Sequence, residues 1–187
     1  MPNYRRARIP GGCFFFTLVT DRRRPLFRRA TARKLLGDAL RRCRLRWPFE
    51  LTAIVLLPEH LHTIWTLPPD DDGFARRWGW LKKEFTKAWL SVGGSEQAVS
   101  AGRQREGRRG VWQPRFWEHT IQDEEDFARH FDYIHFNPVK HGLASTPPEW
   151  PWSSFHRWVR QGVYPPNWAC GTDPPSHLGG MDDTVGE

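Results

Sequence analysis

Short apolar runs in the first third of the chain predict three buried strands. Residues 13–20 (CFFFTLVT) and 51–57 (LTAIVLL) are rich in aromatic and β-branched side chains, which favour strands. Residues 60–66 (HLHTIWT) follow after only Pro58 and Glu59, which break the apolar pattern. The last two runs are therefore expected to pair as a hairpin.

Two segments beside these runs have the spacing of amphipathic helices. In residues 31–46 the apolar side chains return to one face, and Thr31 is placed to cap the first turn. A second helix is expected at about 73–90, with a cap from Asp70 to Asp72. Its apolar stripe, with spacings of three and four, consists of Phe74, Trp78, Leu81, Phe85 and Ala88.

The second half of the chain predicts one more strand and one more helix. Residues 115–121 (RFWEHTI) have the composition of a strand, and the next helix runs from Asp123 to about Asn137, where Pro138 stops it. The order of the elements is thus β-α-β-β-α-β-α. It predicts an α+β fold of the ferredoxin-like kind, with an antiparallel four-stranded sheet and helices packed on one face.

We expect a single domain over residues 1–164, because a chain of 187 residues suits one hydrophobic core. Residues 91–110 are rich in Gly, Ser and Arg without periodicity, which is typical of a flexible basic loop within a domain. Residues 149–162 (EWPWSSFHRWVRQG) add an aromatic segment. Pro, Gly and Asp dominate residues 165–187, so this tail is expected to be disordered or loosely packed.

The chain is basic, and its charge is unevenly distributed. It carries 28 Lys and Arg against 21 Asp and Glu, and residues 1–46 hold fourteen of the basic residues with only Asp21 and Asp38 opposing them. A polyanion is the natural partner of such a block, with nucleic acid first and an anionic membrane surface second. Some of the eleven Trp residues would also suit stacking on unpaired bases.

The cysteines indicate a reducing compartment. Cys13, Cys43 and Cys170 are odd in number and widely spaced, which is unlike a disulfide framework or a cysteine zinc site. The run GCFFFTLVT is too short to cross a membrane and lacks the cleavage site of a signal peptide. We therefore expect a cytoplasmic protein.

The stretch LPEHLHTIWTLP places His60 and His62 on one face of a strand, since residues i and i+2 point the same way. Two neighbouring imidazoles are a ready pair of metal ligands. The same spacing also arises by chance on the polar face of an outer strand. The pair alone leaves both interpretations open.

The segment HFDYIHFNPVKHG offers a third ligand. Tyr133 and Asn137 are four residues apart and share a helix face. Tyr133 could be a core aromatic, yet the chain uses Trp and Phe freely and holds only three Tyr. If this helix crosses the strand of His60 and His62, Asn137 completes a set of two imidazoles and an amide. Open positions would remain for phosphate oxygens and water, which suits Mg²⁺ or Mn²⁺.

Three segments together resemble the REP-associated tyrosine transposases, a bacterial branch of the single-tyrosine HUH transposases. They are LPEHLHTIWTLP, GVWQPRFWEHTIQDEEDFARHFDYIHFNPVKHG and EWPWSSFHRW, and the opening NYRRARIPGGCFFFTLVT is also similar. The resemblance covers roughly residues 3–160. An HxH strand followed by a Y-x-H-x-N-P helix is far more specific than either motif alone.

The resemblance implies a role for each matching residue. The nucleophile corresponds to Tyr133, and the metal ligands correspond to His60, His62 and Asn137. His135 lies between the nucleophile and the last ligand in the sequence, and it is expected to contact the metal ligands without binding the ion itself. Residues 91–110 and the tail depart from the family pattern, so no role is carried onto them.

The implied reaction is metal-dependent cleavage and transfer of single-stranded DNA. The ion would polarise a phosphate, and cationic surroundings would favour the phenolate of Tyr133, since the usual pKa of tyrosine is about 10. Attack would leave a 5′-phosphotyrosine link and a free 3′-OH, and another 3′-OH could reverse it. The implied substrate is a repetitive extragenic palindrome (REP), a hairpin with an unpaired tetranucleotide 5′ of its stem, which would place the protein at the nucleoid.

Several basic residues are candidates for phosphate contacts, although each could equally be ordinary surface charge. The candidates are Arg22, Arg23, Arg24, Lys82, Lys83, Arg115 and Lys140. Surface or packing positions are expected for the remaining histidines, which are His119, His130, His141, His156 and His177.

Other functions must be weighed against strand transfer. A catalytically inactive relative would bind single-stranded DNA or hairpins without cutting, but the complete motif argues against it. A metal-independent phosphoesterase needs paired H-x-T or H-x-S motifs, and Ile64 stands two residues after His62. A membrane-surface protein would use the basic helix at 31–46 but would leave Tyr133 unexplained, so no membrane partner is expected. Both a monomer and a homodimer are compatible with the sequence, with Tyr133 acting in cis or in trans.

Overall fold

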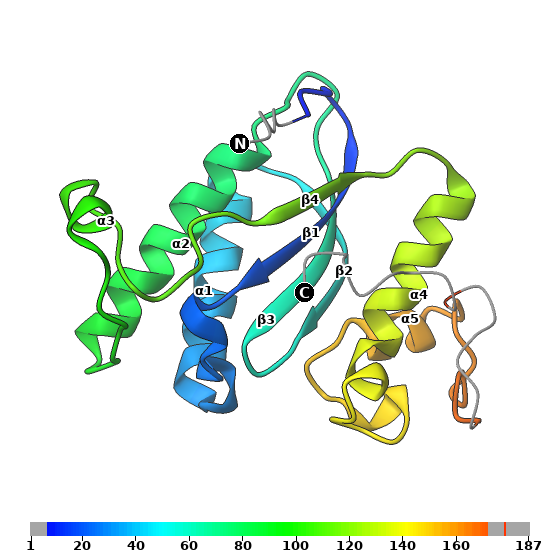
Figure 1. The fold of residues 1–187 in the computed structure, drawn as a ribbon. Coiled ribbons are helices and arrows are strands. Elements are labelled where there is room, and N and C mark those ends of the chain that lie inside the picture. Colours follow the sequence, from blue (N-terminus) through cyan, green and yellow to red (C-terminus); the bar gives the residue numbers. More distant parts are fainter. Residues whose placement is uncertain (1–6, 172–177, 179–187) are drawn as a thin grey trace.

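Four strands form one antiparallel sheet in the order β2-β3-β1-β4 (Figure 1). The structure, a computed structural model, describes residues 7–171 and residue 178. This order, with the first and third strands in the centre, is that of a ferredoxin-like sheet, so the expected α+β fold is confirmed. The strands are β1 (Cys13–Val19), β2 (Glu50–Leu56), β3 (His60–Thr66) and β4 (Trp117–Thr120).

The helices follow the expected order, with two short additions. The helix α3 lies inside the segment 91–110, for which no regular structure was predicted, and α5 lies inside the aromatic segment 149–162, for which no helix was predicted. Single 3₁₀ turns occur at Asp21–Arg23, Leu26–Arg28 and Pro147–Glu149. The α-helices are α1 (Ala30–Arg46), α2 (Phe74–Ser91), α3 (Ala101–Arg105), α4 (Glu124–Lys140) and α5 (Phe155–Arg160).

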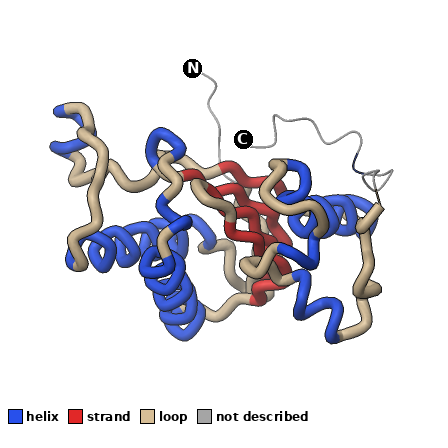
Figure 2. The backbone as a smooth tube through the Cα atoms, turned by 90° about the horizontal axis from the view of Figure 1, so that it is seen from below, coloured by secondary structure: helices blue, strands red, loops and turns tan. Residues whose placement is uncertain are grey.

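Helices cover both faces of the sheet rather than the one face expected (Figure 2). On β1, Phe14 and Phe16 point into a core formed with α1 and α2, whereas Phe15 points into a second core formed with α4 and α5. A central strand buried on both faces reads as a continuous apolar run, which explains why CFFF lacks alternation. Such a run does not show that different helices pack on the two faces of the sheet.

The predicted hairpin of β2 and β3 is confirmed, and it fixes which way β3 faces. Leu56 pairs with Leu61, and the Leu57 amide donates to the His60 carbonyl at 2.9 Å. On its other side β3 pairs with β1, with Thr17 opposite His62. Since Leu61 belongs to the core of α1 and α2, His60 and His62 point to the face that α4 covers.

Three helix ends differ from the prediction. Arg29 is the N-cap of α1, so Thr31 lies inside the helix and does not cap it. Gly73, rather than one of Asp70 to Asp72, is the N-cap of α2. The helix α4 runs through Pro138 to Lys140. A proline in the last turn removes only one helical hydrogen bond, and the His141 amide still bonds to the Asn137 carbonyl at 3.0 Å. Gly142, with φ of +64°, then ends the helix.

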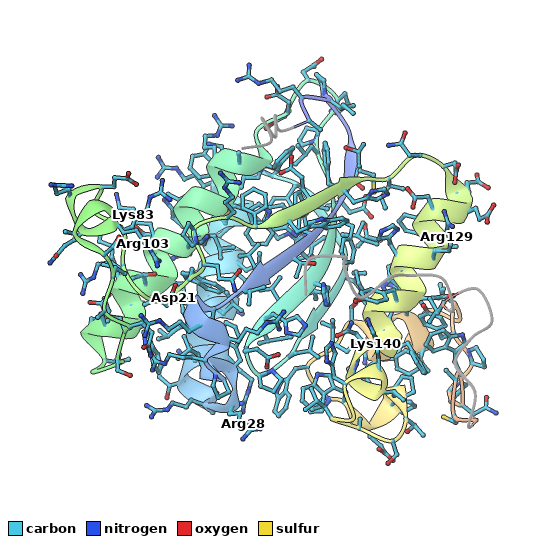
Figure 3. The ribbon with its side chains drawn as sticks, viewed as in Figure 1. Asp21, Arg28, Lys83, Arg103, Arg129 and Lys140 are labelled. Atoms are coloured by element: carbon cyan, nitrogen blue, oxygen red, sulfur yellow. The ribbon has the colours of Figure 1, made fainter. Side chains whose placement is uncertain are left out.

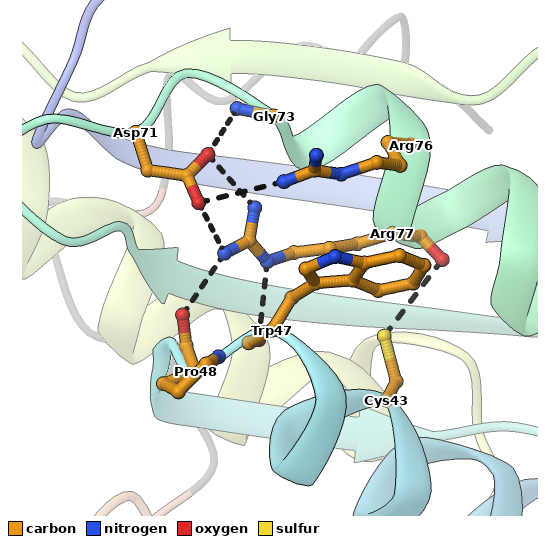
Figure 4. Close-up of polar contacts among 7 residues, drawn as sticks. All are labelled: Cys43, Trp47, Pro48, Asp71, Gly73, Arg76 and Arg77. Atoms are coloured by element: carbon orange, nitrogen blue, oxygen red, sulfur yellow. Dashed lines mark hydrogen bonds and ion pairs between the residues drawn. The ribbon is translucent and has the colours of Figure 1, made fainter.

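A buried arginine anchors α2 (Figure 4). The Arg77 side chain is fully buried and donates to both carboxylate oxygens of Asp71, at 3.0 and 2.7 Å. It also donates to the carbonyls of Trp47 and Pro48, which follow α1. Asp71 in turn accepts from the Gly73 amide, where α2 begins. Asp71 therefore ties both helices of this layer together through its ion pair with a buried arginine.

The segment 91–110 is attached to the body by the ion pair of Arg103 with Asp21, at 3.1 Å. Within the segment, the Arg109 guanidinium donates to both carboxylate oxygens of Glu96. Within the tail, Trp168 packs on Tyr164, with 4.5 Å between the ring centroids. The remaining tail, 172–177 and 179–187, lies outside the described residues, so its expected disorder and the domain boundary at 164 stay predictions.

Within the described part of the chain, no helix has the length and apolar character needed to cross a membrane.

Candidate active site

Two histidine side chains lie between the sheet and α4. His60 and His62 are both fully buried, and their ring centroids lie 4.9 Å apart. The separation follows from their i and i+2 positions on β3, which turn both rings to one face. The predicted side-by-side arrangement is therefore present.

Each of these rings is oriented by a hydrogen bond at Nδ1. His60 Nδ1 lies 2.9 Å from Glu59 Oε1, and His62 Nδ1 lies 2.9 Å from Thr17 Oγ1. The hydrogen bond with His60, together with the positive charge of Arg23 at 3.7 Å, holds the pKa of Glu59 below its usual value despite partial burial. An ionised Glu59 accepts the Nδ1 proton of His60. The Nε2 atom of His60 is then the one left with a lone pair.

One face of α4 lies against the histidine pair. The Tyr133 ring lies 5.4 Å from the His62 ring, and the His141 ring lies 5.3 Å from the His60 ring. Positions 133, 137 and 141 share one helix face at successive turns. Asn137, which is fully buried, therefore sits between two contacts with the same pair of imidazoles.

Three atoms in this region that could bind a metal ion are buried without a hydrogen bond. Among the described residues, Nε2 of His60, Nε2 of His62 and Oδ1 of Asn137 make none, although other atoms hold their side chains, as Thr17 holds His62. Leaving a polar atom unsatisfied in the interior costs about 1–3 kcal/mol. Two imidazole nitrogens and an amide oxygen form a donor set that fits a divalent cation with open coordination positions.

The Tyr133 hydroxyl is covered by a lysine from its own helix. Lys140 Nζ lies 3.3 Å from Tyr133 Oη and 4.9 Å from the centroid of the ring. The Tyr133 side chain is 3% exposed, whereas Lys140 is exposed. Lys140 was predicted to contact phosphate, and the structure places its ammonium group on the phenol.

His135 lies elsewhere than expected. Its ring nitrogens lie 3.2 Å from Tyr164 Oη and 2.8 Å from Ser154 Oγ, on the side of α4 that packs against α5. Ser154 also bonds to the backbone of Ile54 in β2. Burial lowers the pKa of His135 to about 3, so the ring is neutral. Both nitrogens thus belong to the contact between α4, α5 and β2, which gives His135 a packing role here instead of support for the ligands.

The other predicted basic contacts are spread over the surface. Arg22 donates to Gln97 and Arg24 to Ser95, so both hold the segment 91–110. Arg23 faces Glu59, and Arg115 is exposed. Lys83 lies near Arg103 at the α2–α3 end of the molecule, far from Lys140 on α4 (Figure 3).

A groove of about 920 Å³ runs between α2 and the segment from α3 to Phe116. Lys82, which donates to the carbonyls of Gln113 and Pro114, lies in its wall. The cationic side chains along the groove are Lys82, Lys83, Lys87, Arg103, Arg108 and Arg109. The groove therefore offers a concentrated positive surface at a distance from the histidine pair.

Sequence reasoning missed three residues that shape the site. Glu59 and Thr17 orient the histidines, and only strand pairing brings Thr17 next to His62. His141 stands four residues after Asn137, a spacing that places it on the same helix face. That signal was lost because the helix was predicted to stop at Pro138.

Comparison with known proteins finds close relatives along nearly the whole chain. The REP-associated tyrosine transposase of Escherichia coli K12 is 44% identical over 170 residues, which cover 90% of this chain and 92% of the relative. A relative from Haemophilus influenzae is 39% identical over 173 residues, covering 92% of this chain and 96% of its own length. No family model matches the sequence.

A solved structure of a REP-associated tyrosine transposase bound to a REP hairpin has the same fold. It superposes with a TM-score of 0.77 at 40% sequence identity, covering all of this chain and 98% of that one. The likeness therefore extends over both cores, including α4.

Proposed function

The chain belongs to the REP-associated tyrosine transposase family, and we propose that it cuts and rejoins single-stranded DNA beside REP-type hairpins through a covalent 5′-phosphotyrosine link. The observation that carries this proposal is the meeting of β3 and α4. Two imidazoles from the strand and one amide from the helix bury their donor atoms beside the Tyr133 ring.

The proposed ligands of a divalent ion, Mg²⁺ or Mn²⁺, are His60, His62 and Asn137. When bound there, the ion would supply positive charge to a non-bridging oxygen of the scissile phosphate. Glu59 and Thr17 would keep both imidazoles turned so that Nε2 faces the ion. Asn137 would contribute a neutral oxygen, which leaves the site with more positive charge for the phosphate than a carboxylate would.

Tyr133 would act as the nucleophile. Its Oη forms a bond to phosphorus, the bond from phosphorus to O3′ breaks, and O3′ leaves with a proton as a free 3′-OH. The Lys140 ammonium group would stabilise the phenolate, because an adjacent cation favours the charged form of a phenol. The reverse step, attack by another 3′-OH, restores a phosphodiester without hydrolysis and gives strand transfer.

The proposed substrate is a hairpin with an unpaired 5′ tetranucleotide. The related structure holds a REP hairpin. In this chain, the basic groove lies beside α2 and the histidine pair lies on the opposite face of the sheet, so a hairpin that contacts both would use its stem together with its single-stranded flank. A single-stranded flank is favoured at Tyr133, since a DNA strand that is not base-paired can bring its phosphate to a recessed hydroxyl.

A phosphate that approaches Tyr133 would displace Lys140 from it. The tyrosine is almost fully buried, and the exposed Lys140 contacts its hydroxyl. A DNA phosphate would attract the ammonium group electrostatically and leave it close to the developing charge. The same residue would then serve the resting and the reacting states.

The test is cleavage of a labelled REP-type hairpin with a 5′ flank, in the presence of Mg²⁺ or Mn²⁺. Wild type is expected to give a covalent protein–DNA adduct that mass spectrometry assigns to Tyr133, whereas Tyr133→Phe binds the hairpin with similar affinity and forms no adduct. Hairpin binding by wild type without cleavage or adduct would instead support the alternative, a binding protein without catalytic activity. Because the proposed substrate is DNA, the proposed place of action is the nucleoid. The protein would act there as a monomer or a homodimer.

A further inference from the structure

A second cluster of metal-binding side chains lies in the first half of α4, away from Lys140 at the other end of that helix (Figure 3, where Arg129 marks the first half). His119 comes from β4, and Asp126 and His130 come from consecutive turns of α4. One ligand atom from each of the three lies within 4.8 Å of the others. The cluster shares no residue with the proposed DNA-cleaving site.

The Asp126 carboxylate is held between the two imidazoles. His119 Nε2 lies 2.7 Å from Oδ2, and His130 Nδ1 lies 3.0 Å from Oδ1. The Gln122 amide also donates to Oδ2, at 2.9 Å. Arg129, at 3.9 Å, is the nearest cation to this carboxylate among the described salt bridges and lies too far for a hydrogen bond.

The hydrogen bonds of the cluster show which ring nitrogens carry a proton. A carbonyl or carboxylate oxygen only accepts, so His130 Nδ1, which lies 2.9 Å from the Asp126 carbonyl, and His119 Nε2, which faces Asp126 Oδ2, both donate. An ion bound at these nitrogens would replace their protons.

The composition of the cluster favours a transition metal. Two imidazoles and one carboxylate are a common ligand set for Zn²⁺, which takes a water as its fourth ligand at open sites. His119 has 31% of its side chain exposed, so solvent can reach this side of the cluster. Asp126 and His130 are at least nine-tenths buried, which fixes two of the three ligands.

The two imidazole rings must rotate relative to each other before both can bind one ion. Their centroids lie 4.5 Å apart, and the rings are nearly parallel, at 13°. An imidazole binds a metal in the plane of its ring, so stacked rings cannot both point at a common ion. His119, as the more exposed ring, is the one that can turn.

We propose that His119, Asp126 and His130 form a second metal site, for a divalent transition metal of the zinc class, which clamps the edge strand β4 to the helix that carries Tyr133. The phenyl ring of Phe15 keeps this site apart from the first one. Its centroid lies 4.8 Å from the His130 ring and 5.4 Å from the His62 ring. His130 is three residues before Tyr133, so an ion here would restrain the turn that presents the nucleophile. The proposal does not depend on DNA cleavage.

The experiment measures Zn²⁺ binding to the untagged full-length chain carrying His60→Ala and His62→Ala, which removes the first site. Titration against a chromophoric zinc chelator is expected to give one Zn²⁺ per chain. Adding His119→Ala or Asp126→Asn should weaken that binding at least tenfold, whereas His156→Ala, at a ring bonded to the Trp150 carbonyl, should not change it. Circular dichroism of each variant at equal temperature confirms that the fold is kept.

Cobalt substitution supplies a readout that a merely structural role would not give. With Co²⁺, the same background should show the visible absorption of a tetrahedral site, and His119→Cys should add a sulfur-to-cobalt charge-transfer band. Absence of stoichiometric Zn²⁺ in the background variant, or binding that His119→Ala leaves unchanged, would overturn the proposal. The three residues would then be a hydrogen-bonded cluster alone.

Discussion

The ammonium nitrogen of Lys140 lies 3.3 Å from the hydroxyl oxygen of Tyr133, two turns back along the same helix. The contact exists because α4 continues through Pro138, which brings Lys140 onto the last helical turn. A helix ending at Asn137 would leave the position of Lys140 undetermined. The proposed role of Lys140 at Tyr133 therefore depends on the continuation of α4 through Pro138.

The first prediction concerns this pair. Lys140→Ala should slow single-turnover cleavage at pH 7 by about tenfold to a hundredfold, because an interaction that favours the phenolate is lost. The deficit should shrink as the pH rises, since hydroxide then takes over the deprotonation of Tyr133. Rates between pH 6 and 10 check this, and Lys140→Arg, which keeps the charge, is the matched control. A deficit of constant size at every pH would contradict the assigned role.

The second prediction concerns metal removal. Treatment with EDTA should abolish adduct formation and leave hairpin affinity within a few-fold of its initial value, because the ligands bury their donor atoms away from the surface. Asn137→Ala should also keep the hairpin affinity and should lower the rate of adduct formation about a hundredfold. Asn137→Asp keeps an oxygen ligand and should retain cleavage with Mn²⁺. Full activity of Asn137→Ala with metal present would remove this residue from the ligand set.

The third prediction is a pH dependence of stability from His135. Its pKa is about 3 in the folded protein, against an ordinary value of 6.5. Between these values the unfolded chain binds a proton that the folded chain does not, so stability falls as the pH falls below 6.5, by about 1.4 kcal/mol per unit. His135→Gln keeps polar contacts without titrating. The stability advantage of wild type over this variant should shrink by about 2 kcal/mol from pH 7 to pH 5 in urea unfolding. An advantage independent of pH would show that His135 is not buried and neutral.

The fourth prediction tests the ion pair between the buried Arg77 and Asp71. Asp71→Ala should lower the free energy of unfolding by about 2 kcal/mol, because it leaves the Arg77 guanidinium buried without its carboxylate. Asp72→Ala, at the exposed neighbour, is the control and should change stability little. Denaturant unfolding at pH 7 compares the two, and equal effects would mean that Arg77 is satisfied by the two carbonyls alone.

The fifth prediction concerns the basic groove. Lys83→Ala should weaken hairpin binding a few-fold and reduce the slope of log affinity against log salt by about 1, as expected for one lost phosphate contact. Lys34→Ala, on the exposed side of α1, should leave both quantities unchanged. Fluorescence anisotropy at several salt concentrations measures both, and identical slopes for Lys83→Ala and wild type would exclude the groove from the DNA path.

Local patterns in the sequence determined much of this protein. The hairpin and the shared face of His60 and His62 follow from the two-residue repeat of a strand. The common face of Tyr133 and Asn137 follows from the helical repeat. These relationships depend only on backbone geometry over a few residues, so a single sequence is enough to predict them.

Only the tertiary structure decided what those faces meet. The run CFFF is apolar on both sides, so it could not indicate that α4 covers the face opposite α1 and α2. The packing of α4 against β3 places Asn137 between the contacts of Tyr133 and His141 with the histidine pair. It likewise turns His135 away toward Ser154 and brings His119 to Asp126. These are contacts between different elements, and they depend on how the side chains of all elements pack in one interior, which no local repeat encodes.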